Sequence, residues 1–494
     1  MTDKFDCIIV GAGFAGSCAA IKLAKAGASV LLVERAEVPG QKNMTGGVLW
    51  GRELDDILPN WWKDAPVERF IDHKRLSFLT EDSSFSIDFQ SAEWGKEPYN
   101  GFSVLRSRID AWLAKKAEEA GANLICGITV RSLAKDKNGK VIGVQGVTQD
   151  DVIRADCVVI ADGINSRLAL QAGLRDAPPR RPTGYAKRKE WTHREEERKE
   201  REGEKFKCVG EISSHGGGGP MEVPPSMSDW YDMHWCAIGV KEIIKLPVDV
   251  MENRFHLNGN SGFANEMVAG FLPGGIKAGV SLYTNKDTLS LSVVINMASL
   301  KAAADRKEAI PSFEIIERAK QHPYIRDLIK GGEVVEYAAH LIPEGGWHLI
   351  SRGAFSASGV LVAGDAAGLC YSNGMVIQGM NYAAASGKMA ADAILRCKKS
   401  GDFSAAALRS YDEALTSSYV IQDFKNFSRV QELTWDDRMH HVYPEVIADV
   451  FKGLINENGI PKKSVQDIIL TAMKKNDVGL LGAIWHAIRM RGMV

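Results

Sequence analysis

The hydrophobic pattern of the first 34 residues predicts a strand, a helix and a second strand. Residues 5–10 are an apolar run of strand length, and residues 17–27 are an alanine-rich stretch that is typical of a helix. Residues 28–33 form a second apolar run, which ends at Glu34. This order predicts a βαβ unit at the start of the chain.

Three glycines join the first predicted strand to the helix with the spacing of a dinucleotide-binding turn. Gly11 permits the tight turn, Gly13 lets the backbone approach a pyrophosphate, and Gly16 allows the helix to pack closely on the strand. The helix N-terminus offers unpaired N–H groups and a positive dipole end to the anion. Glu34 is placed to accept hydrogen bonds from ribose hydroxyls and would repel a 2′-phosphate, so NADP is a poor fit.

Two later strand-like runs end in glycine and aspartate. Residues 156–161 lead into Asp162 and Gly163, and residues 359–363 lead into Gly364 and Asp365, followed by small residues that predict a helix start. Backbone N–H groups there are placed to meet a second anion, while Asp365 accepts a ribityl hydroxyl. Each dipeptide alone is a common turn, but both together behind the glycine turn favour FAD over NAD.

In these motifs the chain resembles the FAD-dependent group that folds like p-hydroxybenzoate hydroxylase and geranylgeranyl reductase. The resemblance implies an α/β fold with a Rossmann-like FAD-binding domain, an inserted domain with a mixed β-sheet and a helical C-terminal region. It also implies that one extended FAD contacts residues from all three motifs, from a strand at 128–130 and from 105–108. These residues are Gly11, Gly13, Gly16, Glu34, Arg35, Arg106, Val130, Asp162, Gly163, Gly364 and Asp365.

Two further segments narrow the resemblance. The glycine-bearing loop 39–48 is either an ordinary surface loop or a segment that passes close to a flat ring, and the segment 336–346 reads Glu-Tyr-Ala-Ala-His-Leu-Ile-Pro-Glu-Gly-Gly. With residues 364–367, they resemble the electron-transfer-flavoprotein:quinone oxidoreductases, and within them the FixC-type proteins. That resemblance covers residues 1–180 and about 240–450. It implies a flavin ring near Gly46, Gly47, Gly374, Gln378, Gly379 and Asn381.

The same resemblance implies an FAD electron carrier. Electrons would come from a two-subunit electron-transfer flavoprotein and leave to a membrane quinone. Long members of the family carry a four-cysteine domain, whereas no cysteine follows Cys397 here, so the iron–sulfur cluster is expected on a separate ferredoxin-like subunit. No catalytic side chain is assigned, because the flavin does the redox chemistry. The alternatives are a reductase or monooxygenase of an isoprenoid or aromatic substrate, and a non-catalytic scaffold that FAD stabilises.

The predicted domains are an FAD-binding domain of residues 1–180 and 340–420, a substrate or quinone-type domain of residues 181–339, and a helical region of residues 421–494. Strands are predicted at 280–284 and 289–295, with a helix at 313–322. Residues 187–239 are an expected insertion, in which 16 of the first 21 residues are charged. It is either a solvated hairpin or a docking arm for a partner. Its spacing of Cys208, His215, His234 and Cys236 matches no standard metal site, so no metal is expected.

Composition and charge exclude several classes of protein. Of 494 residues 45% are hydrophobic, which supplies a large core, and the net charge of −1 argues against nucleic-acid binding through bulk charge. The eight cysteines form no Cys-x-x-Cys pair, and neither a signal peptide nor an 18-residue apolar stretch is visible. We therefore expect a cytoplasmic protein, and the resemblance adds a peripheral position at the inner face of the cytoplasmic membrane.

Two apolar segments leave their roles open. Residues 263–275 form a loop-like apolar patch that either contacts quinone and membrane or belongs to the core. Residues 478–491 predict an apolar helix with a tryptophan and basic residues near its end. That helix either lies in a membrane interface or docks on protein.

Overall fold

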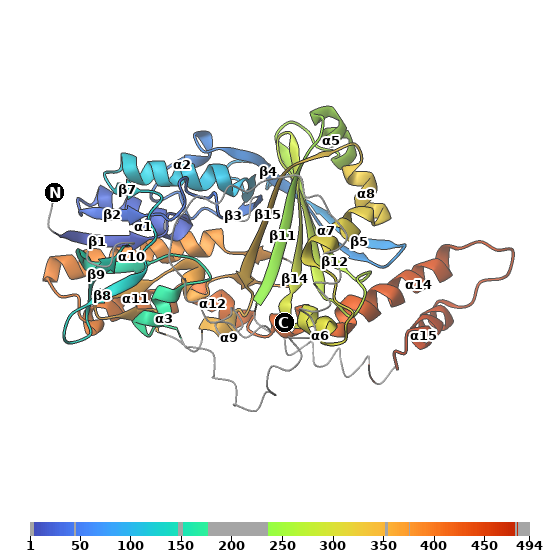
Figure 1. The fold of residues 1–494 in the computed structure, drawn as a ribbon. Coiled ribbons are helices and arrows are strands. Elements are labelled where there is room, and N and C mark those ends of the chain that lie inside the picture. Colours follow the sequence, from blue (N-terminus) through green and yellow to red (C-terminus); the bar gives the residue numbers. More distant parts are fainter. Residues whose placement is uncertain are drawn as a thin grey trace, which may run out of the picture. The chain divides into compact units, whose positions relative to one another are not determined.

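Two large β-sheets with helices packed against them form the part of the chain that the computed structural model describes (Figure 1). The described residues are 4–43, 46–146, 152–175, 236–350, 354–374, 376–479 and 482. All of them belong to one compact unit made of residues 1–176 and 233–494. Most of the expected insertion at 187–239, and most of the predicted helix at 478–491, lie outside the described residues.

The first sheet is built around the predicted βαβ unit. Its core is parallel and runs in the order β17, β10, β1, β2, β7, with the short β16 pairing antiparallel at the edge. Helix α1 (Phe14–Lys25) contacts α2 (Arg106–Glu119) and α10 (Met380–Ser400). The strands are β1 (Phe5–Val10), β2 (Val30–Val33), β7 (Asn123–Ile125), β8 (Ser132–Lys135), β9 (Val141–Gln145), β10 (Val152–Ile160), β16 (Ser356–Ala357) and β17 (Val360–Val362).

The second sheet has nine strands and is mixed. It runs in the order β15, β11, β14, β13, β12, β4, β6, β3, with β5 on β4, and only the β12–β4 pair is parallel. Its strands are β3 (Gly47–Trp50), β4 (Val67–Leu79), β5 (Ser84–Gln90), β6 (Gly101–Val104), β11 (Cys236–Lys245), β12 (Ser261–Ala269), β13 (Ala278–Thr284), β14 (Thr288–Asn296) and β15 (Glu333–Pro343).

One face of this second sheet is covered by helices. Apolar side chains of alternate strand positions, such as Val240, Leu291 and Val293, form a buried cluster with residues of these helices. The covering helices are α5 (Val248–Phe255), α6 (Met297–Asp305), α7 (Ser312–Gln321) and α8 (Pro323–Ile329). The other sheet face carries a second set of side chains, which the functional site uses.

The C-terminal part of the described chain is helical, as expected. Helix α10 begins at Met380 after the small hairpin of β18 (Tyr371–Ser372) and β19 (Ile377–Gln378). The helices that follow are α11 (Ala405–Ser417), α12 (Tyr419–Asn426), α13 (Val430–Thr434), the turn η5 (Arg438–Val442), α14 (Tyr443–Ile455) and α15 (Val465–Lys475). None of the helices among the described residues is long and apolar enough to cross a membrane.

Most predicted elements agree with the structure, and two differ. The strands at 5–10, 280–284 and 289–295 and the helix near 313–322 are present. The small residues after Gly364 make only the short turn η4 (Gly364–Ala367), because Gly368 adopts a left-handed backbone with φ of +76° and ends it. Residues 128–130, predicted as a strand, form a loop after Gly127, whose φ is +76°, and β8 starts at Ser132.

Candidate functional site

The glycine turn after β1 has the geometry that the sequence predicts. Gly11 has a φ of +104°, and a Cβ there would lie 2.2 Å from the carbonyl oxygen of Ala161. A Cβ on Gly16 would lie 1.9 Å from the oxygen of Gly11, so a side chain at either position would break the strand–helix contact. At Gly13 the nearest atom to such a Cβ is Nη2 of Arg106, 4.0 Å away. Open space therefore borders the backbone at Gly13.

This space has the donors of an anion site. Gly13 caps helix α1 without a side-chain hydrogen bond, and the first turn of the helix carries no acidic residue. Arg106 lies above the Phe14 ring, 5.4 Å from its centroid, and is held by Asp110 at 2.7 and 2.8 Å. Burial opposes the charge of Arg106, but the Asp110 carboxylate raises its pKa. Arg106 thus stays a cation beside the helix N-terminus.

Three acids line the same region. The Glu34 carboxylate accepts from the N–H groups of Ala12 at 2.9 Å and Ala36 at 2.8 Å, which fixes it at the end of β2. Oδ1 of Asp162 is buried without a hydrogen-bond partner among the described residues, and burial raises the pKa of Asp162 to about 6. Burial also raises the pKa of Asp365, although Arg106 opposes the shift. Acceptors in this state suit the hydroxyl groups of a ligand.

Four further residues that the sequence predicts to contact FAD lie around this anion site. The cation of exposed Arg35 acts on the carboxylate of Asp162, which places the two in the same neighbourhood. Val130 lies in the loop whose start is bound to the backbone of Glu34 through Ile128. Gly163 has a φ of +80° and faces open space. The N–H of Gly364 donates to Ser386 at 3.0 Å, so this donor is already used within the protein.

The residues that the sequence predicts near the flavin ring lie on two loops, next to one face of the second sheet. A Cβ on Gly47 would lie 3.5 Å from Cε of Met380, so loop 39–48 meets the start of α10. Asn381 donates to Gln378 at 2.8 Å, and a Cβ on Gly379 would lie 3.6 Å from Oδ1 of Asp365. Gly374 does not lie beside these residues, because it faces Val430 and Thr434 of the C-terminal helices.

Two side chains at this end escaped the sequence prediction. The Nζ of Lys241 donates to the carbonyl oxygen of Gly46, and Lys241 is only 3% exposed. The ring of Tyr283 lies 5.7 Å from the same amine, and Tyr283 donates to Glu266 at 3.1 Å. The available signal was a lysine within a strand-length segment, 236–244, in which only Lys241 and Glu242 are charged, because its apolar majority predicts a buried strand.

Glu344 forms a further buried acid near this end. It follows β15 directly, is 3% exposed, and leaves Oε2 without a hydrogen-bond partner among the described residues. Burial raises the pKa of Glu344 to about 8, although a hydrogen bond from the Trp435 side chain opposes the shift. Its charge and that of Asp365 both act on the buried thiol of Cys370. The carboxyl group is therefore protonated at neutral pH.

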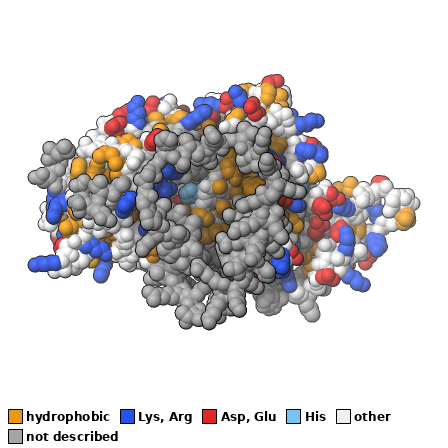
Figure 2. All heavy atoms as spheres, in the orientation of Figure 1, with side chains coloured by type: hydrophobic (Ala, Val, Ile, Leu, Met, Phe, Trp, Pro, Cys, Tyr) orange, Lys and Arg blue, Asp and Glu red, His pale blue; other side chains and the backbone are white. Residues whose placement is uncertain are grey.

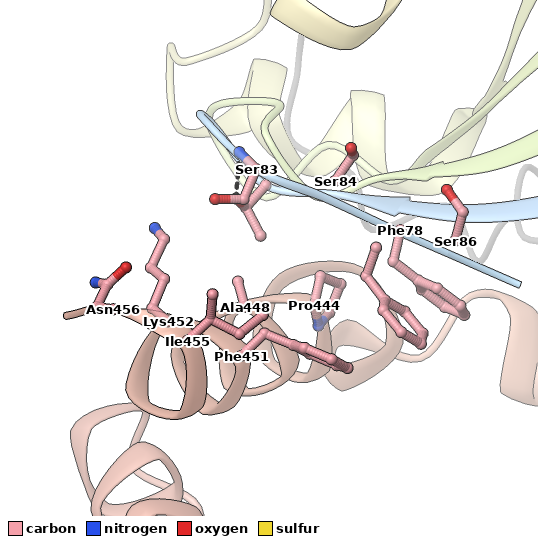
Figure 3. A pocket seen from close by; sticks show the side chains of 12 residues that line it. Phe78, Ser83, Ser84, Ser86, Pro444, Ala448, Phe451, Lys452, Ile455 and Asn456 are labelled. Atoms are coloured by element: carbon pink, nitrogen blue, oxygen red, sulfur yellow. Dashed lines mark hydrogen bonds between the residues drawn. The ribbon is translucent and has the colours of Figure 1, made fainter. Parts of the chain in front are cut away.

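The apolar patch predicted at 263–275 is largely core. Phe263, Met267 and Leu272 are buried in the cluster under the helices of the second sheet. A separate cavity of about 380 Å³ lies between the β4–β5 hairpin and α14, where Phe78, Phe85 and Phe451 supply rings and Lys452 an amine (Figure 3). On the described part of the face in Figure 2, Lys and Arg are interspersed with Asp and Glu. The described residues contain no metal-binding cluster, and Cys236 is buried in β11.

Comparison with known proteins supports the class that this fold and site define. The family described as FAD dependent oxidoreductase matches residues 6–175. A geranylgeranyl bacteriochlorophyll reductase-like protein from Thermoplasma acidophilum shares the fold at a TM-score of 0.58 and 17% identity, covering 96% of each chain. The flavin-dependent brominase Bmp2 follows at 0.57 and 17%, covering 96% of this chain and 99% of its own. The chain is an FAD-dependent oxidoreductase.

Relatives at higher identity define the family. The probable electron transfer flavoprotein-quinone oxidoreductase YdiS of Escherichia coli (strain K12) is 35% identical, over 99% of this chain and 98% of its own length. Protein FixC of the same strain is 38% identical over 98% and 97%. Protein FixC of Azotobacter vinelandii is 34% identical over 97% and 96%. The chain belongs to this family of FixC and electron-transfer-flavoprotein:quinone oxidoreductase proteins, which confirms the predicted family and cofactor.

Proposed function

We propose that the chain carries electrons from an electron-transfer flavoprotein, through a separate ferredoxin-like iron–sulfur subunit, to a quinone. The observation that carries this proposal is the match to YdiS over 98% of that relative's length, because its printed name joins the flavoprotein and the quinone. FAD supplies the electron-carrying chemistry when bound. The solved structures at 17% identity support the fold alone, so they favour neither a reductase nor a halogenase here.

The FAD would lie along the residues described above. The N-terminus of α1 and Arg106 would hold the pyrophosphate, and Glu34 the ribose next to it. Asp162 and Asp365 would accept hydrogen bonds from hydroxyl groups in the middle of the cofactor. The flavin ring would lie between Gly46–Gly47 and the loop at 378–381. Gly13 fits this cofactor because open space borders its backbone. Asp162 fits it because its Oδ1 is buried without a hydrogen-bond partner among the described residues.

The test of electron transfer is anaerobic stopped-flow absorbance of the FAD-loaded full chain. The chain is mixed with reduced electron-transfer flavoprotein, with and without the ferredoxin-like subunit, and then with a quinone analogue. We expect the visible absorbance of the flavin to fall only when that subunit is present and to recover when quinone is added. Bleaching only by NADH or NADPH would instead support a reductase or monooxygenase, and an FAD that never changes would support the scaffold.

The position of the cofactor is tested by Gly13→Val. Gly13 has a φ of −79°, which valine adopts without strain, so the substitution fills the open space and leaves the turn intact. We expect FAD affinity to fall at least tenfold in fluorescence titration of the apoprotein. Ala26→Val at the exposed end of the same helix is the matched control and should bind as the original chain does. Equal affinities for both variants would place the cofactor elsewhere.

We also propose that the chain touches the cytoplasmic membrane from its inner face through α14 and α15. Exposed apolar side chains gather there, with Ile455, Ile460 and Val465 between 59% and 69% exposed, beside Lys452 and Lys462. The measurement is co-sedimentation with vesicles of phosphatidylethanolamine and phosphatidylglycerol. The full chain should sediment with them, and the double substitution Ile455→Asp with Ile460→Asp should release most of it. If the double variant sediments with the vesicles as the original chain does, this surface does not make the membrane contact.

A further inference from the structure

Lys241 is a cation that the fold buries without giving it a carboxylate. It lies in the middle of β11, between Ala338 of β15 and Ser292 of β14, on the sheet face opposite the covering helices. Its amine reaches only a backbone carbonyl, that of Gly46, and the ring face of Tyr283. A buried ammonium normally has an anionic partner, because removing the charge from water is unfavourable unless an opposite charge compensates it.

The carboxylates near this amine are already engaged. Tyr283, whose ring faces Lys241, donates a hydrogen bond to Glu266. Glu266 is itself paired with Lys74. Asp110 is paired with Arg106, and the positive charge of Arg106 acts on Lys241. Burial, together with this charge, lowers the pKa of Lys241 to about 7. Among the described residues no ion pair compensates Lys241, so this end of the site carries excess positive charge.

The neighbours of Lys241 belong to the proposed ring site. Gly46 has a φ of +69°, and a Cβ there would lie 2.2 Å from Oγ of Ser290 on the next strand, so the loop is pressed against this sheet face. The adjacent Gly47 meets Met380 at the start of α10. Lys241 therefore reaches the loop that borders the proposed ring site from the sheet side.

We propose that Lys241 supplies the positive charge that stabilises the flavin ring when it becomes negative. An oxidised flavin that takes up two electrons and one proton gains one negative charge, which a nearby cation in a dry site stabilises. The oxidised ring is neutral, so the cation raises the reduction potential of the flavin. This inference rests on the proposed position of the ring, but not on the identity of the electron donor or the quinone.

Sulfite provides a test without either partner. It adds to the oxidised flavin ring, places negative charge on it and bleaches its visible absorbance. The FAD-loaded full chain and Lys241→Met are titrated with sulfite at pH 6, below the pKa of Lys241, and their potentials are compared by dye equilibration. We expect Lys241→Met to bind sulfite at least tenfold more weakly and to have the lower potential. Lys245→Met, on an exposed residue at the end of the same strand, should match the original chain.

Two further variants keep the test decisive if methionine weakens FAD binding. Lys241→Arg keeps the charge, and Lys241→Gln keeps a similar length without it. The inference requires the arginine variant to bind sulfite within about threefold of the original chain and the glutamine variant at least tenfold more weakly. Equal sulfite affinity in the arginine and glutamine variants, or in the methionine variant and the original chain, overturns it. Failed electron transfer in the stopped-flow experiment would leave this result unaffected.

Discussion

On strand β14 the two faces of the nine-stranded sheet are equally buried but chemically opposite. On β14, Leu291 is 0% exposed beneath the helices, and its neighbour Ser292 is 1% exposed on the other face. The helix-covered face is mainly apolar, although Glu242 pairs there with Lys320 of α7 and Asn265 donates to Tyr324 of α8. The opposite face carries Ser290, Lys241 and Tyr283, and its polar groups bind one another or loop 39–48.

The contrast shows that alternating polar and apolar residues in a strand are compatible with two different surroundings of the polar face. In an antiparallel sheet, polar residues at every second position usually face solvent. Here Ser290 and Ser292 of β14 are polar but buried, and Ser281 and Tyr283 of β13 are half-buried. Polar groups removed from water need partners. A buried polar face therefore marks a surface that receives a ligand or another part of the protein. In this chain it borders the proposed flavin ring.

The largest expected effect separates the two faces within one strand. Leu291→Ala removes a fully buried side chain from the apolar cluster and leaves a cavity, so we expect about 2–5 kcal/mol lower free energy of unfolding. Ser292→Ala removes only the hydroxyl that pairs with Ser281, at a cost of about 1 kcal/mol. Urea denaturation of both variants measures the difference. Equal losses would show that the faces do not differ as described.

A second effect concerns the buried acid at the end of β15. Because burial raises the pKa of Glu344 from 4.5 to about 8, the folded chain holds a proton that the unfolded chain has lost. The stability of the original chain should thus fall as pH rises from about 4.5 to 8. Glu344→Gln should remove this dependence. It should raise the free energy of unfolding by several kcal/mol at pH 8.5, because each pKa unit is worth about 1.4 kcal/mol, but by little at pH 5. Thermal unfolding at both pH values tests it, and a pH-independent difference would contradict it.

A smaller effect concerns the hydroxyl group of Tyr283 on the polar face. Tyr283→Phe removes the hydrogen bond to Glu266, at 3.1 Å, while the ring that faces Lys241 stays. We expect a loss of about 1 kcal/mol in the free energy of unfolding and no change in sulfite affinity. Chemical denaturation and the sulfite titration together separate the hydroxyl group from the ring. Weaker sulfite binding would assign the hydroxyl a part in the ring site.

The smallest effect is expected on the solvent side of the covering helices. Arg318 and Glu314 of α7 form an exposed i,i+4 pair at 2.9 Å. Arg318→Gln should change the free energy of unfolding by less than about 0.5 kcal/mol, because water already solvates both charges. It serves as the baseline for the four substitutions above. A loss above 1 kcal/mol (about twice that expected for such a pair) would mean that α7 depends on this pair.

The half of the candidate site that lies on the first sheet could be predicted because its residues are close in sequence. Gly11, Gly13 and Gly16 occupy one turn, and the close packing predicted at Gly11 and Gly16 depends on local backbone geometry, which the structure shows. Val130 was predicted within a strand, but Gly127 turns the chain there and leaves it in a loop. Gly374 was grouped with the ring loop, but it packs on α13, a contact between segments about 60 residues apart that no local pattern encodes.

The sequence by itself determined the glycine turn after β1, the family and most strands, because these depend on short motifs and on hydrophobic periodicity. Only the tertiary structure decided which strand face is covered by helices and which borders the proposed ring. Lys241 and Gly46 are 195 positions apart, and they meet because β11 lies inside the second sheet while loop 39–48 crosses its polar face. Periodicity separates the two faces of a strand, but only packing determines whether the polar face meets water, protein or ligand.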